Sequence, residues 1–398
     1  MRVVQINANA DFGSTGLVVQ GIHECLKNNG YESLIVYQRA KTPPENGYKV
    51  GSAIDWKCHA LRTRLFGHYG FYSKRPTRRL LKYLDEVKPD IVHFHNLHSN
   101  FINIKLLCEY LADQDIPTII TLHDCWFFTG KCFHYIDQSC DKFIVGCNAC
   151  PKRYAPPAYY LKDSSQKDWE RKKELFENIK KLCVVGCSEW IANEASKSFL
   201  NTHPIMSISN GVDTTIFKPR KSNLRKVYSI DNETFVILGM ANKWFLPRNK
   251  EVIDKIFNIT KSVVIIIGCT PKQLERQKEM PSNVILKGFI SNRSELSEYY
   301  SISNVFVNLT HADTSPTVNM ESVCCGTPVV TYDVGGSPEL IHKGTGIVVK
   351  EDDIDGILCA IKKIREDKFP HCTSIGIKHF DSQHSFSKYI NLYNQIIK

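Results

Sequence analysis

The segment Asp313-Thr-Ser-Pro-Thr-Val-Asn-Met-Glu321 carries two carboxylates eight positions apart. It follows an apolar, strand-like run and leads into a helix-forming segment. The first turn of such a helix leaves the amides of Thr317, Val318 and Asn319 without intrahelical partners, so these amides and the helix dipole favour an anion. Because one carboxylate precedes the helix and the other lies inside it, the two can contact different ends of one ligand. The residues alone leave a second interpretation open, a capped core helix with a solvated glutamate.

Three cations follow the apolar run Phe235–Leu238 closely, namely Lys243, Arg248 and Lys250. Cations fixed near the end of a strand can stabilise negative charge that develops on a phosphate leaving group. Most lysines and arginines are solvated surface charges, and this is the alternative for each of the three.

Histidines lie at the ends of two predicted strands. His123 follows one apolar run directly, where its ring can point into a ligand site, and we expect the next residue, Asp124, to orient the loop. His93, His95 and His98 form the pattern His-x-His-x-x-His after another run. An alternating strand puts the first two on one face but supplies no carboxylate partner, so we predict that they line the site or support the fold and bind no metal.

Four of the fifteen cysteines, Cys132, Cys140, Cys147 and Cys150, lie within nineteen positions. Four close thiols in a reducing compartment can bind zinc tetrahedrally and so order a loop that has little regular structure. Zinc sites usually have a Cys-x-x-Cys pair at both ends, whereas seven residues separate the first two cysteines here. A structural zinc and free or redox-active thiols therefore both stay open.

Short β-branched runs alternate with helical patterns along the chain, which predicts a doubly wound α/β architecture with parallel strands covered on both faces. The predicted strands are Val3–Ile6, Leu34–Val36, Ile91–Phe94, Thr118–Leu122, Val184–Gly186, Phe235–Leu238, Val263–Ile267, Val284–Leu286, Val305–Asn308 and Pro328–Thr331.

The repeat restarts near residue 235, which predicts one domain over 1–215 and a second over 216–379. We place the hinge near Asn210-Gly211-Val212-Asp213, where Gly211 supplies the conformational freedom of a turn. The final helix, expected over Ser385–Ile397 within the C-terminal segment 380–398, has Phe386, Tyr389, Ile390, Tyr393 and Ile397 on one face and can pack back on the first domain.

The composition is that of a globular protein, and no apolar segment is long enough to span a bilayer. The strand-like N-terminus, which lacks a secretion signal, predicts a cytoplasmic protein. The net charge of +10 favours phosphate-bearing partners, and the segment Lys57–Lys88 holds nine Lys or Arg against Asp85 and Glu86, with aromatic residues among them. This segment suits an anionic membrane surface at the inner face of the plasma membrane, nucleic acid, or solvent alone.

The pattern of Asp313, seven further positions, Glu321 and a following Gly-x-Pro-Val resembles the donor-site signature of glycosyltransferase family 4. The likeness covers nearly the whole chain, and includes Gly13-Ser-Thr-Gly16, Thr121-Leu-His-Asp124, Gly186-Cys-Ser188 and Ser209-Asn-Gly-Val-Asp213. The runs HFHNLHSNFINIK and LHDCWFFTGKCF are similar to those of the subgroup that includes the colanic-acid transferases of enteric bacteria. Asp313, where glutamate is commoner, and Glu251, where glycine is usual, depart from the family's pattern.

The resemblance implies a GT-B fold, with two Rossmann-like domains facing across a cleft, and retaining transfer of a sugar from a nucleotide diphosphate donor. It implies catalytic roles for His123, Lys250, Asp313 and Glu321, with Asp313 on the donor sugar and Glu321 on the ribose. The donor-binding residues it implies are Gly16, Lys243, Arg248, Thr317, Val318, Asn319 and Glu321. It implies no catalytic metal.

The resulting hypothesis is a metal-independent hexosyltransferase that uses a UDP- or GDP-linked sugar to extend a lipid-linked or oligosaccharide acceptor. The products expected are surface polysaccharides such as O-antigen of lipopolysaccharide, capsule or colanic acid, made at the inner membrane face, with no nucleic acid as partner. The alternatives are a nucleotide-sugar epimerase of the same fold and a zinc-containing nucleic-acid-binding protein.

Overall fold

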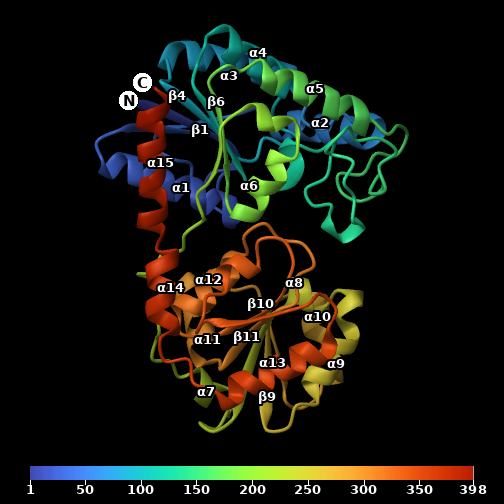
Figure 1. Cartoon of the computed structure of the whole chain (residues 1–398), viewed down its shortest axis with the longest axis vertical. Coiled ribbons are helices and arrows are strands. Elements are labelled where there is room, and N and C mark those ends of the chain that lie inside the picture. Colours follow the sequence, from blue (N-terminus) through green and yellow to red (C-terminus); the bar gives the residue numbers. More distant parts are fainter. Residues whose placement is uncertain (398) are drawn as a thin grey trace. The chain divides into compact units, whose positions relative to one another are not determined.

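A computed structural model describes residues 1–397, which divide into two compact units. Unit 1 comprises Met1–Asn210 and the C-terminal segment from Gln383, and unit 2 comprises Gly211–Ser382. The division falls five residues before the boundary expected after residue 215. Each unit consists of one sheet with helices packed on it (Figure 1).

Unit 1 contains a seven-stranded sheet in the order β3-β2-β1-β4-β5-β6-β7, and every neighbouring pair is parallel. The strands are β1 (Arg2–Asn9), β2 (Glu32–Arg39), β3 (Gly47–Lys49), β4 (Ile91–Phe94), β5 (Thr118–Leu122), β6 (Leu182–Gly186) and β7 (Ile205–Ser207). The first six follow the Rossmann order, in which the chain winds outward in one direction from β1 and then in the other from β4.

The helices of unit 1 are α1 (Gly13–Asn28), α2 (Ala53–Phe66), α3 (Lys74–Val87), α4 (Ile104–Asp113), α5 (Ser165–Glu177), α6 (Glu189–Ser196) and α15 (Ser382–Ile396). Helices α1 and α15 form one apolar cluster with Val3, Ile91 and Ile119 of the strands. Helices α3, α4 and α5 contribute to a second cluster with Val4 and Val92, which belong to the opposite face. The alternation of side chains along each strand thus separates two cores.

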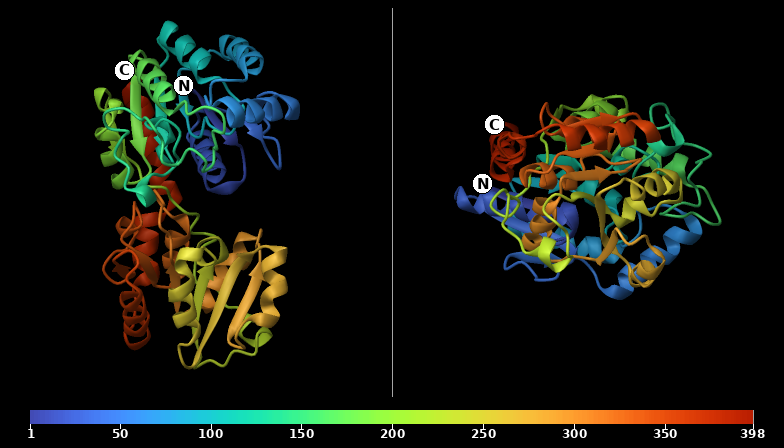
Figure 2. Two further views of the ribbon diagram at one scale, coloured as in Figure 1. Left: turned by 90° about the vertical axis from the view of Figure 1, so that its right-hand side faces the viewer. Right: turned by 90° about the horizontal axis from the view of Figure 1, so that it is seen from below.

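Unit 2 repeats this plan with a six-stranded parallel sheet in the order β10-β9-β8-β11-β12-β13, drawn in yellow and orange in Figure 2. Its strands are β8 (Phe235–Met240), β9 (Ser262–Cys269), β10 (Val284–Gly288), β11 (Val305–Asn308), β12 (Val329–Tyr332) and β13 (Gly346–Val349). Its helices are α7 (Leu224–Val227), α8 (Ala241–Trp244), α9 (Lys250–Phe257), α10 (Pro271–Glu275), α11 (Arg293–Ile302), α12 (Thr317–Cys324), α13 (Ile354–Glu366) and α14 (Cys372–Phe380). The doubly wound α/β prediction is confirmed.

All ten predicted strands are present, and three strands were not predicted: β3, β7 and β13. Each of these lies at an edge of its sheet and has only three or four residues. Strands β3 (Gly-Tyr-Lys) and β7 (Ile-Met-Ser) lack the continuous apolar run that identifies a central parallel strand, whereas the apolar run of β13, residues 347–349, is only three residues long. In the part of the chain that the structure describes, no helix is long and apolar enough to cross a membrane.

The chain passes between the units twice, and inside unit 2 these two ends run side by side. Val212 forms an isolated parallel bridge with Asp381, through Val212 N to Phe380 O at 2.8 Å and Ser382 N to Val212 O at 3.0 Å. A Cβ atom on Gly211 would lie 2.3 Å from Ser382 Cα. The expected role of Gly211 is therefore corrected, because it provides room for a neighbouring backbone and has no positive φ.

Candidate active site

The strand order of unit 2 reverses between β8 and β11, and ligands of such sheets bind beyond the carboxyl ends of the strands at this point. The segments that follow these two strands are residues 241–250 and 309–316. The first contains the three predicted cations and the second contains Asp313. The topology therefore brings together two of the motifs found in the sequence.

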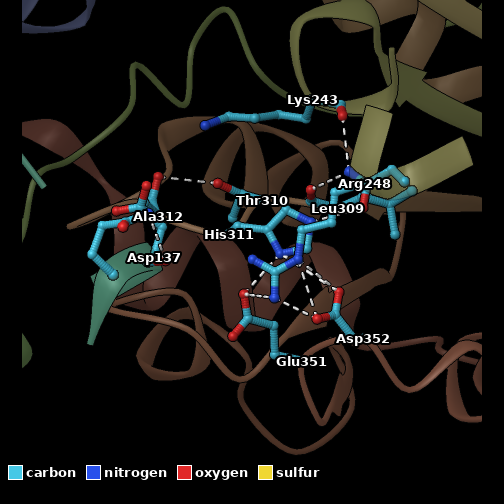
Figure 3. A network of polar contacts seen from close by, with 11 residues as sticks. Asp137, Lys243, Arg248, Leu309, Thr310, His311, Ala312, Glu351 and Asp352 are labelled. Atoms are coloured by element: carbon cyan, nitrogen blue, oxygen red, sulfur yellow. Dashed lines mark hydrogen bonds and ion pairs between the residues drawn. The ribbon is translucent and has the colours of Figure 1, made fainter. Parts of the chain in front are cut away.

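Hydrogen bonds join these two segments. Asn249, which is fully buried, donates from Nδ2 to the carbonyls of Lys243 and Leu309, both at 2.9 Å. The amide oxygen of Asn249 must then accept from Nε2 of His311, at 2.7 Å. Trp244 adds a bond from Nε1 to Val307 O at 2.8 Å. The loop with the cations is thus fixed to the end of β11 (Figure 3).

The three cations have different surroundings. The guanidinium of Arg248 pairs with Glu351 at 3.1 Å and with Asp352, as Figure 3 shows, and the hydrogen bond that it donates to Asp352 raises the pKa of Arg248. Lys250 begins α9, and its side chain is 80% exposed and bonded to Asp254 at 2.9 Å. Lys243 has no ion pair among residues 1–397. Two of the predicted cations are therefore readily available to a ligand, whereas Arg248 is already neutralised.

Of the predicted donor residues on helix α12, Thr317, Val318 and Glu321 are partly exposed, whereas the side chain of Asn319 is fully buried. Between Leu309 and Tyr332 every residue is buried except Ala312, Asp313, Thr317, Val318, Glu321 and Gly326. Thr317 and Glu321 are four positions apart and share one face of the helix. The amide of Asn319 donates to Pro316 O at 3.0 Å, which leaves the amides of Thr317 and Val318 for a ligand. No side chain caps this end of the helix.

Glu321 lies in an unusual environment for a carboxylate. Burial raises its pKa to about 7, against the opposing effects of Arg293 and of the hydrogen bond from Tyr300. The hydroxyl of Tyr300 donates to Glu321 Oε2 at 3.1 Å. A carboxyl group that gains and loses its proton near neutral pH is typical of functional sites. Tyr300 was not foreseen from the sequence, because it precedes Glu321 by 21 positions on a different helix.

Three buried polar atoms near this end of the sheet form no hydrogen bond with the described residues: Ser315 Oγ, Asn319 Nδ2 and Ser337 Oγ. Unpaired buried polar atoms are rare and costly in native proteins. Ser337 follows β12, and its loop is fixed to the segment that precedes α12 by the bond from Gly336 N to Asp313 O at 3.1 Å. The carboxyl edge of unit 2 thus combines unused polar groups, two carboxylates and cations.

In unit 1 the order reverses between β1 and β4, and His95 lies immediately after β4. His123 follows β5 and is partly exposed, and its Nε2 lies 3.0 Å from Nδ1 of the fully buried His95. Burial lowers the pKa of His123 to about 4, so the ring is neutral at ordinary pH. His93 is also fully buried, and its ring bonds Thr121 at 2.7 Å and Tyr393 of α15 at 2.8 Å. These histidines belong to polar networks of the fold.

Asp124 orients the loop after β5, as predicted. It accepts from His98 Nε2 at 2.8 Å and from the amide of Trp126 at 2.9 Å. Burial acts to raise its pKa but is outweighed by His98 and the Trp126 amide, so the pKa of Asp124 lies below its usual value. The carboxylate therefore contributes stability that is present above the unfolded pKa and is lost as the pH falls through the lower folded pKa.

We expect Asp124→Ala to lower the free energy of unfolding by about 2 to 3 kcal/mol near neutral pH, because two buried donors lose their acceptor. Urea denaturation followed by circular dichroism measures this loss. The loss should shrink only as the pH falls below about 4, through the lower pKa that Asp124 has in the folded protein. Asp141→Ala, on an exposed loop residue, is the control and should change the value by less than about 0.5 kcal/mol. An equal change in both variants would contradict the prediction.

Gly16 is buried at the start of α1, where a Cβ atom would lie 3.2 Å from Asn9 O and 3.3 Å from Asp11 N. It permits close packing of the helix against the loop after β1. Gly13 begins the same helix with a φ of +70°, which glycine adopts without strain. No side chain caps this helix and its first turn has no acid. The structure therefore gives Gly16 a packing role at the carboxyl edge of unit 1.

The four clustered cysteines lie in a segment, residues 128–164, whose only regular element is the 3₁₀ turn Ile136–Gln138. Cys132 and Cys150 are hydrogen-bonded, and Cys147 Sγ accepts from Gly130 N at 3.1 Å. Within residues 1–397 no group of three or more His, Cys, Asp or Glu side chains is arranged to hold a metal ion. The zinc site stays a prediction from the spacing.

A buried lysine that the sequence did not single out holds this segment. Lys131 is 1% exposed, and its ammonium donates to the carbonyls of Lys152, Arg153 and Ala155 at 2.7 to 3.0 Å. Three carbonyl acceptors satisfy all three protons of the group. The segment is thus ordered by a central cation.

This geometry is that of two-domain α/β proteins that bind ligands beyond the carboxyl ends of parallel strands. Comparison with known proteins gives the family. Residues 15–216 match the family model described as "Glycosyltransferase Family 4" and residues 250–381 match "Glycosyl transferases group 1". The first match spans more than half of the 398 residues, and the chain belongs to glycosyltransferase family 4.

Individual proteins agree with this assignment. The putative colanic acid biosynthesis glycosyl transferase WcaC of Escherichia coli K12 is 22% identical over 89% of this chain and 88% of its own. Sucrose-phosphate synthase from Thermosynechococcus elongatus superimposes with a TM-score of 0.70 at 16% identity, over 99% and 98% of the two chains. Anabaena HepE in complex with UDP gives 0.68 at 12%, over 99% and 100%. The GT-B fold and the transferase class are confirmed.

Proposed function

We propose that this glycosyltransferase moves a sugar from a UDP- or GDP-linked donor, with retention, to a lipid-linked unit of a bacterial surface polysaccharide. The observation that carries the proposal is the pair Asp313 and Glu321 on either side of the uncapped N-terminus of α12. A nucleotide sugar has hydroxyls at both ends and a diphosphate between them, which this arrangement matches. The UDP complex of HepE and the colanic-acid name of WcaC support the donor class and the pathway class.

In this proposal the diphosphate is bound by the amides of Thr317 and Val318 and by Lys243 and Lys250. Negative charge grows on the β-phosphate as the sugar leaves with oxocarbenium character, and donors fixed there lower the barrier. These groups supply the stabilisation without a catalytic metal. The carboxylate of Glu321 accepts from the ribose hydroxyls, as charge-assisted bonds favour.

Residues of the remaining motifs act on the transferred sugar. Asp313 accepts from hydroxyls of that sugar. His123 of unit 1 serves the same sugar as a neutral ring, since its pKa is about 4. A neutral imidazole presents a lone pair to developing positive charge, whereas an imidazolium would oppose it.

A membrane-facing acceptor fits the surface of α2 and α3. A hollow between the two helices is lined by Arg62, Lys74, Arg75 and Arg78, and its only acid, Asp55, is engaged by Ser52 in capping α2. Ile54 and Leu61, seven positions apart on α2, are exposed apolar residues of one of these two helices. We propose that this surface contacts anionic lipid at the cytoplasmic face of the plasma membrane. Cations and apolar side chains together favour such an interface.

The double variant Arg75→Glu, Arg78→Glu should bind vesicles containing phosphatidylglycerol at least about 30-fold more weakly, because each cation near a membrane contributes about 1 kcal/mol and each new carboxylate is repelled by the anionic lipid. Vesicle sedimentation measures the binding, and binding of the unmodified protein should weaken as salt is added. Lys27→Glu with Lys180→Glu changes the net charge equally outside this surface and is the control. Equal losses in both double variants would contradict a local docking surface.

The function is tested by thermal-shift measurement with UDP- and GDP-sugars, since a ligand in excess raises the unfolding temperature by mass action. The donor that stabilises the protein is then incubated with a lipid-linked acceptor, and the anomeric configuration of the product is read by NMR. A product formed from the donor alone would indicate an epimerase. Absence of stabilisation by every nucleotide sugar, with binding to nucleic acid that falls steeply with salt, would overturn the proposal.

A further inference from the structure

Three neighbouring strands of unit 1 carry polar residues on the face covered by α1 and α15. Along β1, β4 and β5 this face begins with the apolar Val3, Ile91 and Ile119. At alternating positions towards the carboxyl ends it continues with Gln5, then His93 and His95, then Thr121 and His123. The packed helices exclude water from all of these except His123, which is partly exposed.

The orientation of the Gln5 amide is determined by its contacts. Its Nε2 donates to the carbonyl of Val19 in α1 at 3.2 Å, because a carbonyl can accept only from the amino side of the amide. Its Oε1 therefore faces His95 Nε2, at 3.1 Å. An amide oxygen only accepts, so Nε2 of His95 must carry a proton.

The position of the proton on His95 then determines the position of the proton on His123. Burial, with His93 and His123 nearby, keeps the pKa of His95 well below 6.5, so the ring is neutral and has a single N–H proton. Because this proton is on Nε2, Nδ1 of His95 is unprotonated. His123 Nε2 lies 3.0 Å from that nitrogen and must be the donor. Since His123 is itself neutral, its proton is on Nε2 and its Nδ1 is a hydrogen-bond acceptor.

We infer that Gln5 and His95 are positioning residues that fix the tautomer of His123, so that Nδ1 acts on the transferred sugar as an acceptor. This Gln5–His95–His123 relay rests on the proposed function for its catalytic meaning. An unprotonated Nδ1 can accept a hydrogen bond from a sugar hydroxyl. It also places the negative end of the imidazole dipole towards developing positive charge. The opposite tautomer would present an N–H there and oppose the transition state.

A second network lies beside the relay and provides a control. The ring of His93 is 4.1 Å from that of His95 between centroids, but its nitrogens bond Tyr393 and Thr121, and Thr121 bonds the hydroxyl of Tyr389 at 3.0 Å. No nitrogen of His93 takes part in the relay. Tyr389→Phe therefore removes a buried hydroxyl of similar depth without changing the proton positions of Gln5, His95 and His123.

The tautomer is measured directly on the unmodified protein labelled with ¹⁵N-histidine. Long-range ¹H–¹⁵N spectra near neutral pH distinguish a bare nitrogen from a protonated one, and the His123 signals are assigned by their loss in His123→Gln. We expect a protonated Nε2 and a bare Nδ1. A bare Nε2 on His123 in the unmodified protein would overturn the inference, whatever the activity.

Variants of Gln5 test the relay itself. In Gln5→Leu we expect the His123 signals to shift towards a mixture of tautomers and kcat to fall about tenfold, with the donor KM changed less than twofold. Gln5→Glu should restore both readouts, because a buried carboxylic acid stays protonated and can donate to Val19 while accepting from His95. Tyr389→Phe should leave both readouts unchanged. A Gln5→Leu protein with the original His123 spectrum would also overturn the relay.

The proposed function and the positioning role of Gln5 and His95 would be overturned by different results. If no nucleotide sugar is turned over, the proposed function fails while the spectrum of the unmodified protein still decides the tautomer. If turnover occurs but kcat of Gln5→Leu and of Tyr389→Phe falls equally, the positioning role is overturned.

Discussion

Glu321→Gln is expected to lower kcat/KM about 100-fold and, at the same time, to stabilise the fold above neutral pH. The activity falls because an amide forms weaker bonds with ribose hydroxyls than a carboxylate, and two charge-assisted bonds contribute about 1.5 to 3 kcal/mol each. Glutamine keeps an acceptor for Tyr300, which donates to Glu321 at 3.1 Å. The fold should therefore stay intact, and steady-state kinetics with the donor identified by thermal shift measures the loss.

The stability effect follows from the pKa of about 7 of Glu321. Between the usual pKa of about 4.5 and 7, the folded state binds more protons than the unfolded state, so stability falls as the pH rises through this window. The loss amounts to at most about 3 kcal/mol above pH 7 and is absent from the glutamine variant. Thermal unfolding should be measured at about pH 5 and pH 8. The unfolding temperature of Glu321→Gln, relative to that of the unmodified protein, should be higher at pH 8 than at pH 5.

Glu233→Gln is the matched control, since Glu233 is exposed and lies before β8 at the opposite end of the strands. It should change neither kcat/KM nor the pH dependence of unfolding. A Glu321→Gln protein with normal activity, or with the same pH dependence as the unmodified protein, would show that Glu321 is an ordinary residue of α12.

Lys250→Ala and Lys243→Ala are each expected to lower kcat/KM by about 10- to 100-fold, because each removes a cation from the diphosphate in the transition state. The side chain of Lys250 pairs with Asp254 one turn away, and exposed pairs of this kind contribute little to stability. Its ammonium can therefore turn to a ligand at little cost. Arg248→Ala should have a smaller effect, since Glu351 and Asp352 already neutralise that guanidinium.

Binding measurements locate the effect on the phosphates. Calorimetry with nucleoside diphosphate and monophosphate should show that Lys250→Ala loses affinity for the diphosphate chiefly. Lys255→Ala, at the other end of α9 and paired with Glu251 at 3.5 Å, is the control and should bind both normally. Equal losses for the two nucleotides would contradict a role on the diphosphate.

Central strands could be predicted from the sequence because burial on both faces requires a continuous apolar run, as in Val263–Ile267. The edge strand β7 could not, since none of its three residues is fully buried and Met206 is exposed. The apolar face predicted for α15 is buried at Phe386, Tyr389 and Tyr393. Ile397, which was predicted to lie on the same face, is 42% exposed and follows the last residue of the helix. The helix itself packs with α1 and groups with unit 1.

The site was predictable only where its chemistry lies in one segment. Asp313, Thr317 and Glu321 share a strand–loop–helix unit, so their spacing already placed them together. Partners that come from distant strands leave no local pattern. Glu351 and Asp352 reach Arg248 from over 100 positions away, and Gln5 reaches His95 across 90. The proton positions in the second case depend on which way an amide faces, which no spacing encodes.

The bridge between Val212 and Asp381 has a consequence for the engineering of the protein. Unit 2 begins and ends at one place, with Gly211 in contact with Ser382, while unit 1 continues on either side of it. Unit 2 is therefore inserted within the sequence of unit 1. Its two ends lie close together, as they do in domains that tolerate insertion into another protein. Unit 2 of a relative could be exchanged through these two adjacent joints, and under the proposed function the exchange would change the nucleotide sugar used while leaving unit 1 unaltered.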